Sequence, residues 1–165
     1  MPRLLISGAT VIGLALLSVG NPQHPLLVWN ATASAPIGLY RVLAAQAVRH
    51  GDLVLAETPP TVARLAAERG YVPLHVPLVK RVAAMAGDRV CMQGDAVVID
   101  HTVVALRVAQ DNLGRPLPYW QGCRVLRRHD LFLLMRAAPH SFDSRYFGPV
   151  PTSSILGVLE PIWTR

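Results

Sequence analysis

Short apolar segments separated by turn residues recur along most of this chain, and they constrain its fold more than any other feature. Glycine–aspartate pairs begin at Gly51, Gly87 and Gly94, and each pair favours a turn that leads into the next segment. The segments are rich in valine, leucine and isoleucine, as is typical of β-strands. We therefore predict strands over residues 26–30, 38–43, 52–56, 76–85, 89–92, 97–99, 102–108, 131–135 and 155–163.

One predicted helix interrupts this pattern of strands. Pro59 and Pro60 suit a first helical turn, Thr58 can cap it, and Gly70 follows the helical body over residues 62–69. A length of 165 residues suits one domain with a substantial core. We therefore expect a mainly β domain with one short helix.

The N-terminal segment forms a separate unit. Residues 4–19 carry no charge, and such a run is long enough for a helix that crosses a membrane. Arg3 precedes the run and no lysine or arginine follows before Arg41, so the positive-inside rule places the N-terminus in the cytoplasm. We predict a single membrane anchor over residues 1–20 and a domain outside the cytoplasm over residues 21–165.

A cleaved signal peptide is the alternative for this segment. Ala31-Thr32-Ala33 resembles an A-x-A cleavage site. That site lies far beyond the apolar run, however, and the long separation favours an uncleaved anchor.

The net charge of +6 raises the question of a nucleic acid or an anionic membrane as partner. The basic residues are scattered, and the only adjacent pairs are Lys80-Arg81 and Arg127-Arg128. No basic run contains interleaved aromatic residues. The sequence therefore argues against nucleic-acid binding.

The two cysteines, Cys91 and Cys123, do not form a C-x-x-C pair, and no histidine stands at metal-ligand spacing from them. In a domain outside the cytoplasm, one disulfide is the natural inference. Two unpaired buried thiols are the alternative. The six histidines form no cluster, so we expect neither a metal nor another cofactor.

Lys80 is the only lysine among sixteen basic residues. Arginine stays protonated at any useful pH, whereas a buried lysine can lose its proton and act as a base. Lowering its pKa from near 10.4 to about 7–8 costs on the order of 4 kcal/mol, which burial among apolar neighbours such as Val79 and Val82 would supply. The alternative is a lysine at a strand end whose amine reaches water.

Ser34 is the strongest candidate for a nucleophile that such a base would activate. It lies between Ala33 and Ala35, whose small side chains let a peptide backbone come close, and Pro36 stiffens the turn. On these features alone, an ordinary loop serine is the alternative.

Three sequence boxes resemble those of type I signal peptidases. The S-x-P-x-G-x-Y pattern that begins at Ser34 is especially similar to the nucleophile motif of TraF-type conjugal transfer peptidases. Lys80-Arg81-Val82 with Gly87-Asp88 resembles the box that carries the signal peptidase lysine. Residues 141–148 resemble the family's S-x-D-S-R-x-x-G box. The boxes occur in family order and span nearly the whole chain after the predicted anchor.

This resemblance implies a signal-peptidase-like β fold and a serine–lysine dyad. Ser34 would attack the scissile carbonyl, and Lys80 would be the general base and then the general acid. The backbone N–H of Ser34 and the hydroxyl of Thr32 would form the oxyanion hole.

The third box implies supporting roles. Ser141 would orient the lysine amine, and Asp143 and Arg145 would form an ion pair behind the site. A purely structural turn is the alternative for Arg145. The G-D-N-R sequence that precedes this box in the general bacterial enzyme is missing from residues 135–140, so the resemblance favours the conjugal group.

The implied function is that of a serine endopeptidase held by one segment in the bacterial inner membrane, with its catalytic domain in the periplasm. Its substrate would be an exported pilin precursor of a conjugation or type IV secretion system, which it would cut and in some relatives also cyclise. The alternatives are a general type I signal peptidase, a self-cleaving repressor of the LexA type and a non-enzymatic component of a secretion channel.

Overall fold

The computed structural model describes residues 26–165. The predicted anchor over residues 1–20 lies outside this range. Within the described residues, no helix is both long and apolar enough to cross a membrane.

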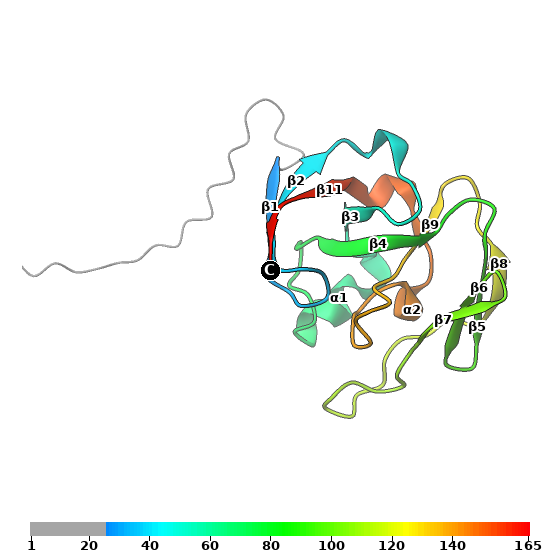
Figure 1. The fold of residues 1–165 in the computed structure, drawn as a ribbon. Coiled ribbons are helices and arrows are strands. Elements are labelled where there is room, and N and C mark those ends of the chain that lie inside the picture. The colour runs from blue at the N-terminus through cyan, green and yellow to red at the C-terminus, as the bar shows by residue number, and fades with distance from the viewer. Residues whose placement is uncertain (1–25) are drawn as a thin grey trace, which may run out of the picture.

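Two antiparallel sheets make up the domain (Figure 1). The larger sheet has the order β1-β2-β11-β3-β4-β9-β10 and the smaller has the order β7-β6-β5-β8. The strands are β1 (Leu27–Asn30), β2 (Gly38–Leu43), β3 (Leu53–Ala56), β4 (Leu78–Ala84), β5 (Arg89–Gln93), β6 (Ala96–Ile99), β7 (Thr102–Leu106), β8 (Gly122–Val125), β9 (Asp130–Leu133), β10 (Val150–Pro151) and β11 (Ile155–Thr164). The mainly β prediction is confirmed.

The helices are short. The predicted helix is α1 (Pro60–Glu68), and Gly70 follows it with a φ of 71°, a left-handed conformation that glycine adopts without strain. Thr58 does not cap it, because the N-cap is Pro59 and no side chain bonds there. A second helix, α2 (Ser144–Phe147), was not predicted, since four residues are too few to show a helical period. Two 3₁₀ turns, η1 (Ala45–Ala47) and η2 (Thr152–Ser154), complete the set.

Strand β4 is central to the larger sheet, where it pairs with β3 on one side and β9 on the other. Its side chains are buried except at Arg81, which is exposed, and Ala83, which is half-buried. A fully paired strand in the core is a rigid support, and it carries Lys80.

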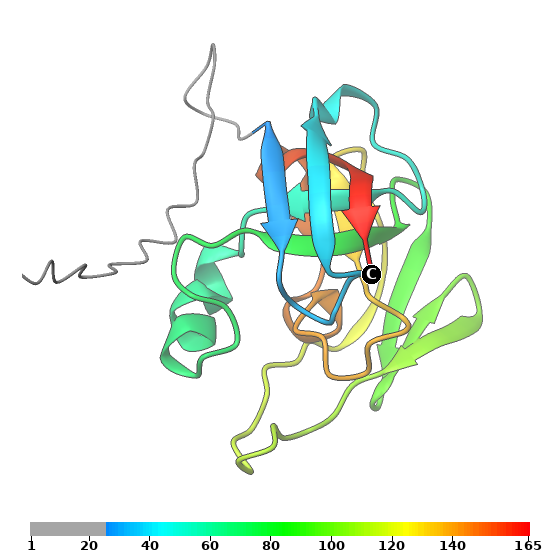
Figure 2. The same ribbon diagram turned by 60° about the vertical axis from the view of Figure 1, so that its left-hand side comes forward.

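The long strand β11 joins two parts of the larger sheet, because it pairs with β2 along one half and with β3 along the other. Figure 2 shows β1, β2 and the C-terminal end of β11 side by side. At Gly38 the chains approach so closely that a Cβ would lie 2.0 Å from the carbonyl oxygen of Trp163. Glycine at this position lets the loop between β1 and β2 end against the last strand.

The two sheets share a core. Phe132 and Leu134, from β9 and the residue next to it, pack in one buried cluster with apolar residues of β5 and β6 such as Val90 and Val97. This packing fixes the smaller sheet against the strand that neighbours β4.

Cys91 and Cys123 form the predicted disulfide, at paired positions of β5 and β8. The bond closes a loop with a sequence separation of 32. In the chain-entropy account, a loop of this length stabilises a fold by roughly 3–4 kcal/mol. Reduction should therefore lower the midpoint of thermal unfolding by about 10 °C. Calorimetry of the oxidised and the reduced, alkylated protein measures this shift, and an unchanged midpoint would contradict it.

Candidate active site

The predicted nucleophile, Ser34, lies in the loop between β1 and β2, and Asn30 organises this loop. The buried Asn30 amide nitrogen donates hydrogen bonds to the carbonyls of Thr32, Ala35 and Pro36 at 3.0–3.1 Å. Its side-chain oxygen accepts from the backbone N–H of Thr32 at 3.1 Å and from the Thr32 hydroxyl at 2.9 Å. One side chain thus fixes the path of the loop on either side of Ser34.

Tyr40 adds a second restraint on the same loop. Its side chain is buried, and its hydroxyl donates to the Pro36 carbonyl at 2.6 Å. Neither Asn30 nor Tyr40 was singled out from the sequence. The final tyrosine of the S-x-P-x-G-x-Y pattern was the available signal for Tyr40, whereas an asparagine at a strand end gives none.

The structure brings Ser34, Lys80 and Ser141 together from three distant parts of the chain. The Lys80 amine lies 2.8 Å from the Ser141 hydroxyl and 3.5 Å from the Ser34 hydroxyl. An amine that donates to Ser141 keeps its lone pair free for the Ser34 hydroxyl once it is neutral. The arrangement has the parts of a nucleophile, a base and a group that orients the base.

Burial favours the neutral form of the Lys80 amine, because this residue is only 4% exposed. Desolvation is the largest effect and lowers the pKa of Lys80 from 10.5 to about 8. Asp143 raises this pKa and Arg145 lowers it, in that order of importance. The shift goes in the direction that a lysine base requires.

Thr32, the predicted oxyanion donor, lies beside the nucleophile. Its hydroxyl oxygen is 3.0 Å from that of Ser34 and donates to Asn30 in the arrangement described above. A hydroxyl has one hydrogen, so donation to an oxyanion would require that hydrogen to turn from Asn30.

Asp143 and Arg145 form the predicted ion pair, and both side chains are almost fully buried. The guanidinium binds both carboxylate oxygens, from Nε at 2.8 Å and from Nη2 at 3.0 Å. Arg145 also donates to four backbone carbonyls, which belong to Leu106, Met135, Ala138 and Pro139. Arg145 therefore holds residues 135–139 in place and ties them to the smaller sheet.

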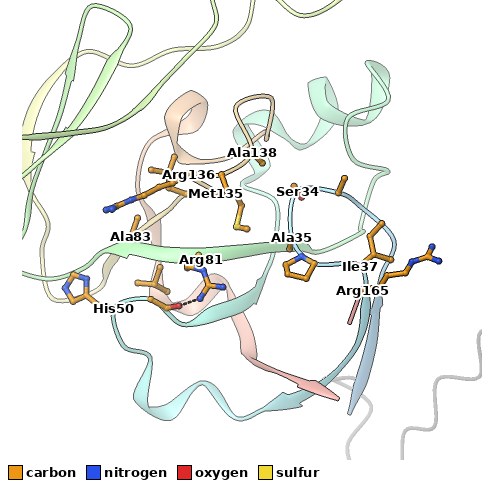
Figure 3. A pocket seen from close by; sticks show the side chains of 16 residues that line it. Ser34, Ala35, Ile37, His50, Arg81, Ala83, Met135, Arg136, Ala138 and Arg165 are labelled. Atoms are coloured by element: carbon orange, nitrogen blue, oxygen red, sulfur yellow. Dashed lines mark hydrogen bonds between the residues drawn. The ribbon is translucent and has the colours of Figure 1, made fainter. Parts of the chain in front are cut away.

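A groove of about 750 Å³ opens beside Ser34 (Figure 3). The nucleophile loop, including Ala35 and Ile37, lines one end. Strand β4 contributes Arg81 and Ala83, and residues 134–138 form the facing wall. A groove of this size next to the candidate nucleophile suits an extended peptide segment.

The sequence profile of the signal peptidase family, peptidase S26, matches residues 2–164. The chain belongs to this family. Among its relatives, the conjugal transfer protein TraF of Agrobacterium fabrum is 40% identical over 98% of this chain and 90% of its own length. The plasmid transfer protein TraF of Escherichia coli is 33% identical over 98% of this chain and 97% of its own length. A crystal structure of a signal peptidase I from Enterococcus faecalis V583 covers 70% of this chain and 98% of its own at 20% identity, with a TM-score of 0.42.

Family membership makes the chain a peptidase of the signal peptidase type, with a mainly β fold. All the predicted site residues lie in one region. Ser34, Lys80, Thr32 and Ser141 form a continuous chain of hydroxyls and one amine. The ion pair at Asp143 lies behind them and supports the groove wall.

The pH dependence of cleavage should report the titration of Lys80. Because only the neutral amine can accept a proton, kcat/KM should rise with pH and level off above the pKa of about 8. Stopped assays from pH 6 to 10 on a fixed peptide measure this profile, with circular dichroism to show that the fold persists. A rate that is flat or falls over this range would contradict the assignment of Lys80 as base.

Proposed function

We propose that this chain is a serine endopeptidase with a Ser34–Lys80 dyad, anchored in the bacterial inner membrane, which processes an exported pilin precursor for conjugative transfer. The observation that carries the proposal is a buried lysine amine held by Ser141 within 3.5 Å of the Ser34 hydroxyl. The names of the relatives, which are conjugal and plasmid transfer proteins, support the biological setting.

In the proposed reaction, Ser34 Oγ attacks the scissile carbonyl carbon while its proton passes to the neutral Lys80 amine. The carbonyl oxygen becomes an oxyanion, which the Ser34 N–H and the Thr32 hydroxyl stabilise. When the C–N bond breaks, Lys80 gives the proton to the leaving amine and an ester to Ser34 remains. Lys80 is then neutral again and able to activate the next nucleophile.

The second nucleophile determines the product. Attack by water, with its proton taken by Lys80 and then given to the departing Ser34 oxygen, breaks the ester and releases a linear pilin with a new carboxylate. Attack by the amino terminus of the same pilin would instead break the ester, pass a proton from the amine through Lys80 to the Ser34 oxygen, and form the peptide bond of a cyclic product. Both routes use the same dyad and the same acyl-enzyme.

A peripheral apolar surface supports attachment to a membrane. Leu26, Trp29, Ile162 and Trp163 are all exposed, and the two tryptophan rings stack with centroids 5.8 Å apart. Tryptophan is favoured at membrane interfaces. This surface adjoins the point where the described domain continues into residues 1–25, which supports an anchor there. The inner membrane and the pilin precursor are the proposed partners, and no role for nucleic acid is proposed.

Mass spectrometry of the pilin tests the function in cells. Donor cells that make the wild-type chain should contain a shortened pilin, and cells that make Ser34→Ala should contain only the precursor. A mature mass lower by one water than the cleaved linear peptide would show cyclisation. Normal pilin in the Ser34→Ala strain would overturn the proposal, and accumulation of other exported precursors there would favour a general signal peptidase.

A further inference from the structure

The groove beside Ser34 is positively charged. Among residues 26–165, its lining contains the three arginines Arg81, Arg136 and Arg165 together with His50, and no aspartate or glutamate. These four residues come from four separate segments of the chain. Ser34 and its alanine and proline neighbours form one end of the groove, where Arg165 lies beside Ile37 (Figure 3).

The arginine charges are not neutralised by neighbouring protein groups. Within residues 26–165, neither Arg81 nor Arg136 forms a salt bridge, although Arg81 donates a hydrogen bond to the Gly51 carbonyl. Only His50 has a carboxylate partner, with its Nε2 3.1 Å from Asp88. A hydrogen bond to a neutral carbonyl oxygen uses one donor of a guanidinium and does not neutralise its charge. Within the described range, Arg81 and Arg136 are therefore cations without an anionic partner.

Arg81 and Arg136 lie farther along the groove than Ser34. In Figure 3, Arg136 and His50 lie at the end away from Ser34, with Arg81 between them and the nucleophile loop. A peptide bound with its scissile bond at Ser34 and its chain along the groove would bring neighbouring residues next to these guanidinium groups. Guanidinium groups bind carboxylates through paired hydrogen bonds, so they select for such groups.

We propose that the groove selects peptide substrates with a carboxylate close to the scissile bond. This inference rests on the proposed function, since it describes the substrate of the same site. The carboxylate would belong either to an acidic side chain or to the C-terminus of a short segment beyond the bond. In both cases Arg136 is a specificity-determining residue.

Peptide binding tests this inference without relying on cleavage. The Ser34→Ala protein is titrated with labelled, alanine-rich peptides that carry one glutamate, or glutamine at the same position, with both ends blocked. A further pair differs only in a free or an amidated C-terminus, which separates a side-chain carboxylate from a terminal one. We expect about tenfold tighter binding of at least one carboxylate peptide at low salt. The preference should shrink near 1 M salt, where charges are screened within about 3 Å.

Variants assign the preference to the groove. Arg136→Gln should reduce the carboxylate preference severalfold, whereas Arg136→Lys, which keeps the charge but not the paired donors, should retain only part of it. Arg64→Gln, on the exposed face of α1, is the matched control and should leave it unchanged. Equal binding of all carboxylate and neutral peptides, or a preference that survives both Arg136→Gln and Arg81→Gln, would overturn the inference.

Cleavage of the same peptides by the wild-type chain separates the two proposals. If carboxylate peptides bind more tightly but no Ser34-dependent cleavage occurs, the proposed function is contradicted and the selectivity of the groove is supported. If neutral and acidic peptides bind equally and are cleaved at equal kcat/KM, the proposed selectivity is contradicted and the peptidase activity is supported.

Discussion

Replacing Lys80 with arginine should lower kcat/KM by at least about 10³-fold, because general-base catalysis and the activation of a serine contribute on this scale. The substitution keeps the positive charge and a long side chain in the buried site. It removes the one property that the mechanism needs, which is the ability to be neutral near pH 8. Peptide cleavage at saturating and subsaturating substrate measures the loss.

A second variant separates chemistry from folding in this experiment. Lys80→Met has a similar length and no charge, so it suits the buried position, yet it should be as inactive as Lys80→Arg. Both proteins should keep a cooperative thermal transition and their Cys91–Cys123 disulfide. Substantial cleavage by either variant would show that Lys80 is not the base.

Replacing Arg145 with methionine should destabilise the fold by about 3–5 kcal/mol, because it leaves Asp143 as a buried carboxylate without its partner. The same change removes four hydrogen bonds to backbone carbonyls of the groove wall and of β7. Chemical denaturation of the wild-type and variant proteins measures the free energy of unfolding.

Arg64→Met serves as the control for Arg145→Met, since Arg64 is exposed and its side chain forms no hydrogen bond with any other residue of the described range 26–165. The control should change the free energy of unfolding by at most about 0.5 kcal/mol. If Arg145→Met cost as little as Arg64→Met, the ion pair would not support the fold in the way its burial indicates.

The sequence predicted that Ser34 and Lys80 lie together, as they do in the structure, because the proposed chemistry explains an unusual composition. A single lysine beside fifteen arginines is expected where a base must be able to lose its proton. The family boxes that contain Ser34, Lys80 and Asp143 occur in the family's order along the chain. The mainly β fold was predictable from short apolar runs and glycine–aspartate turns. The disulfide was predictable from the number of cysteines and the orientation expected for the anchor.

Other features of the site could not be predicted from the sequence, because they depend on which residues become neighbours in the folded chain. The amide of Asn30 finds its five partners only after the loop has folded back on itself. The Asp143 carboxylate caps helix α2 by accepting a hydrogen bond from the Arg145 backbone N–H. The helix is too short to show a helical period in the sequence. The charge of the groove arises from Arg81, Arg136 and Arg165, which are far apart in the chain.

The most direct test of the central claim is mass spectrometry of a pilin precursor incubated with the purified chain or with its Ser34→Ala variant, at equal concentration and pH 9. The wild-type chain should release one defined terminal peptide at a single bond. Ser34→Ala should leave the precursor intact while showing the same thermal transition as the wild type. The same fragment produced at a similar rate by Ser34→Ala would contradict the account.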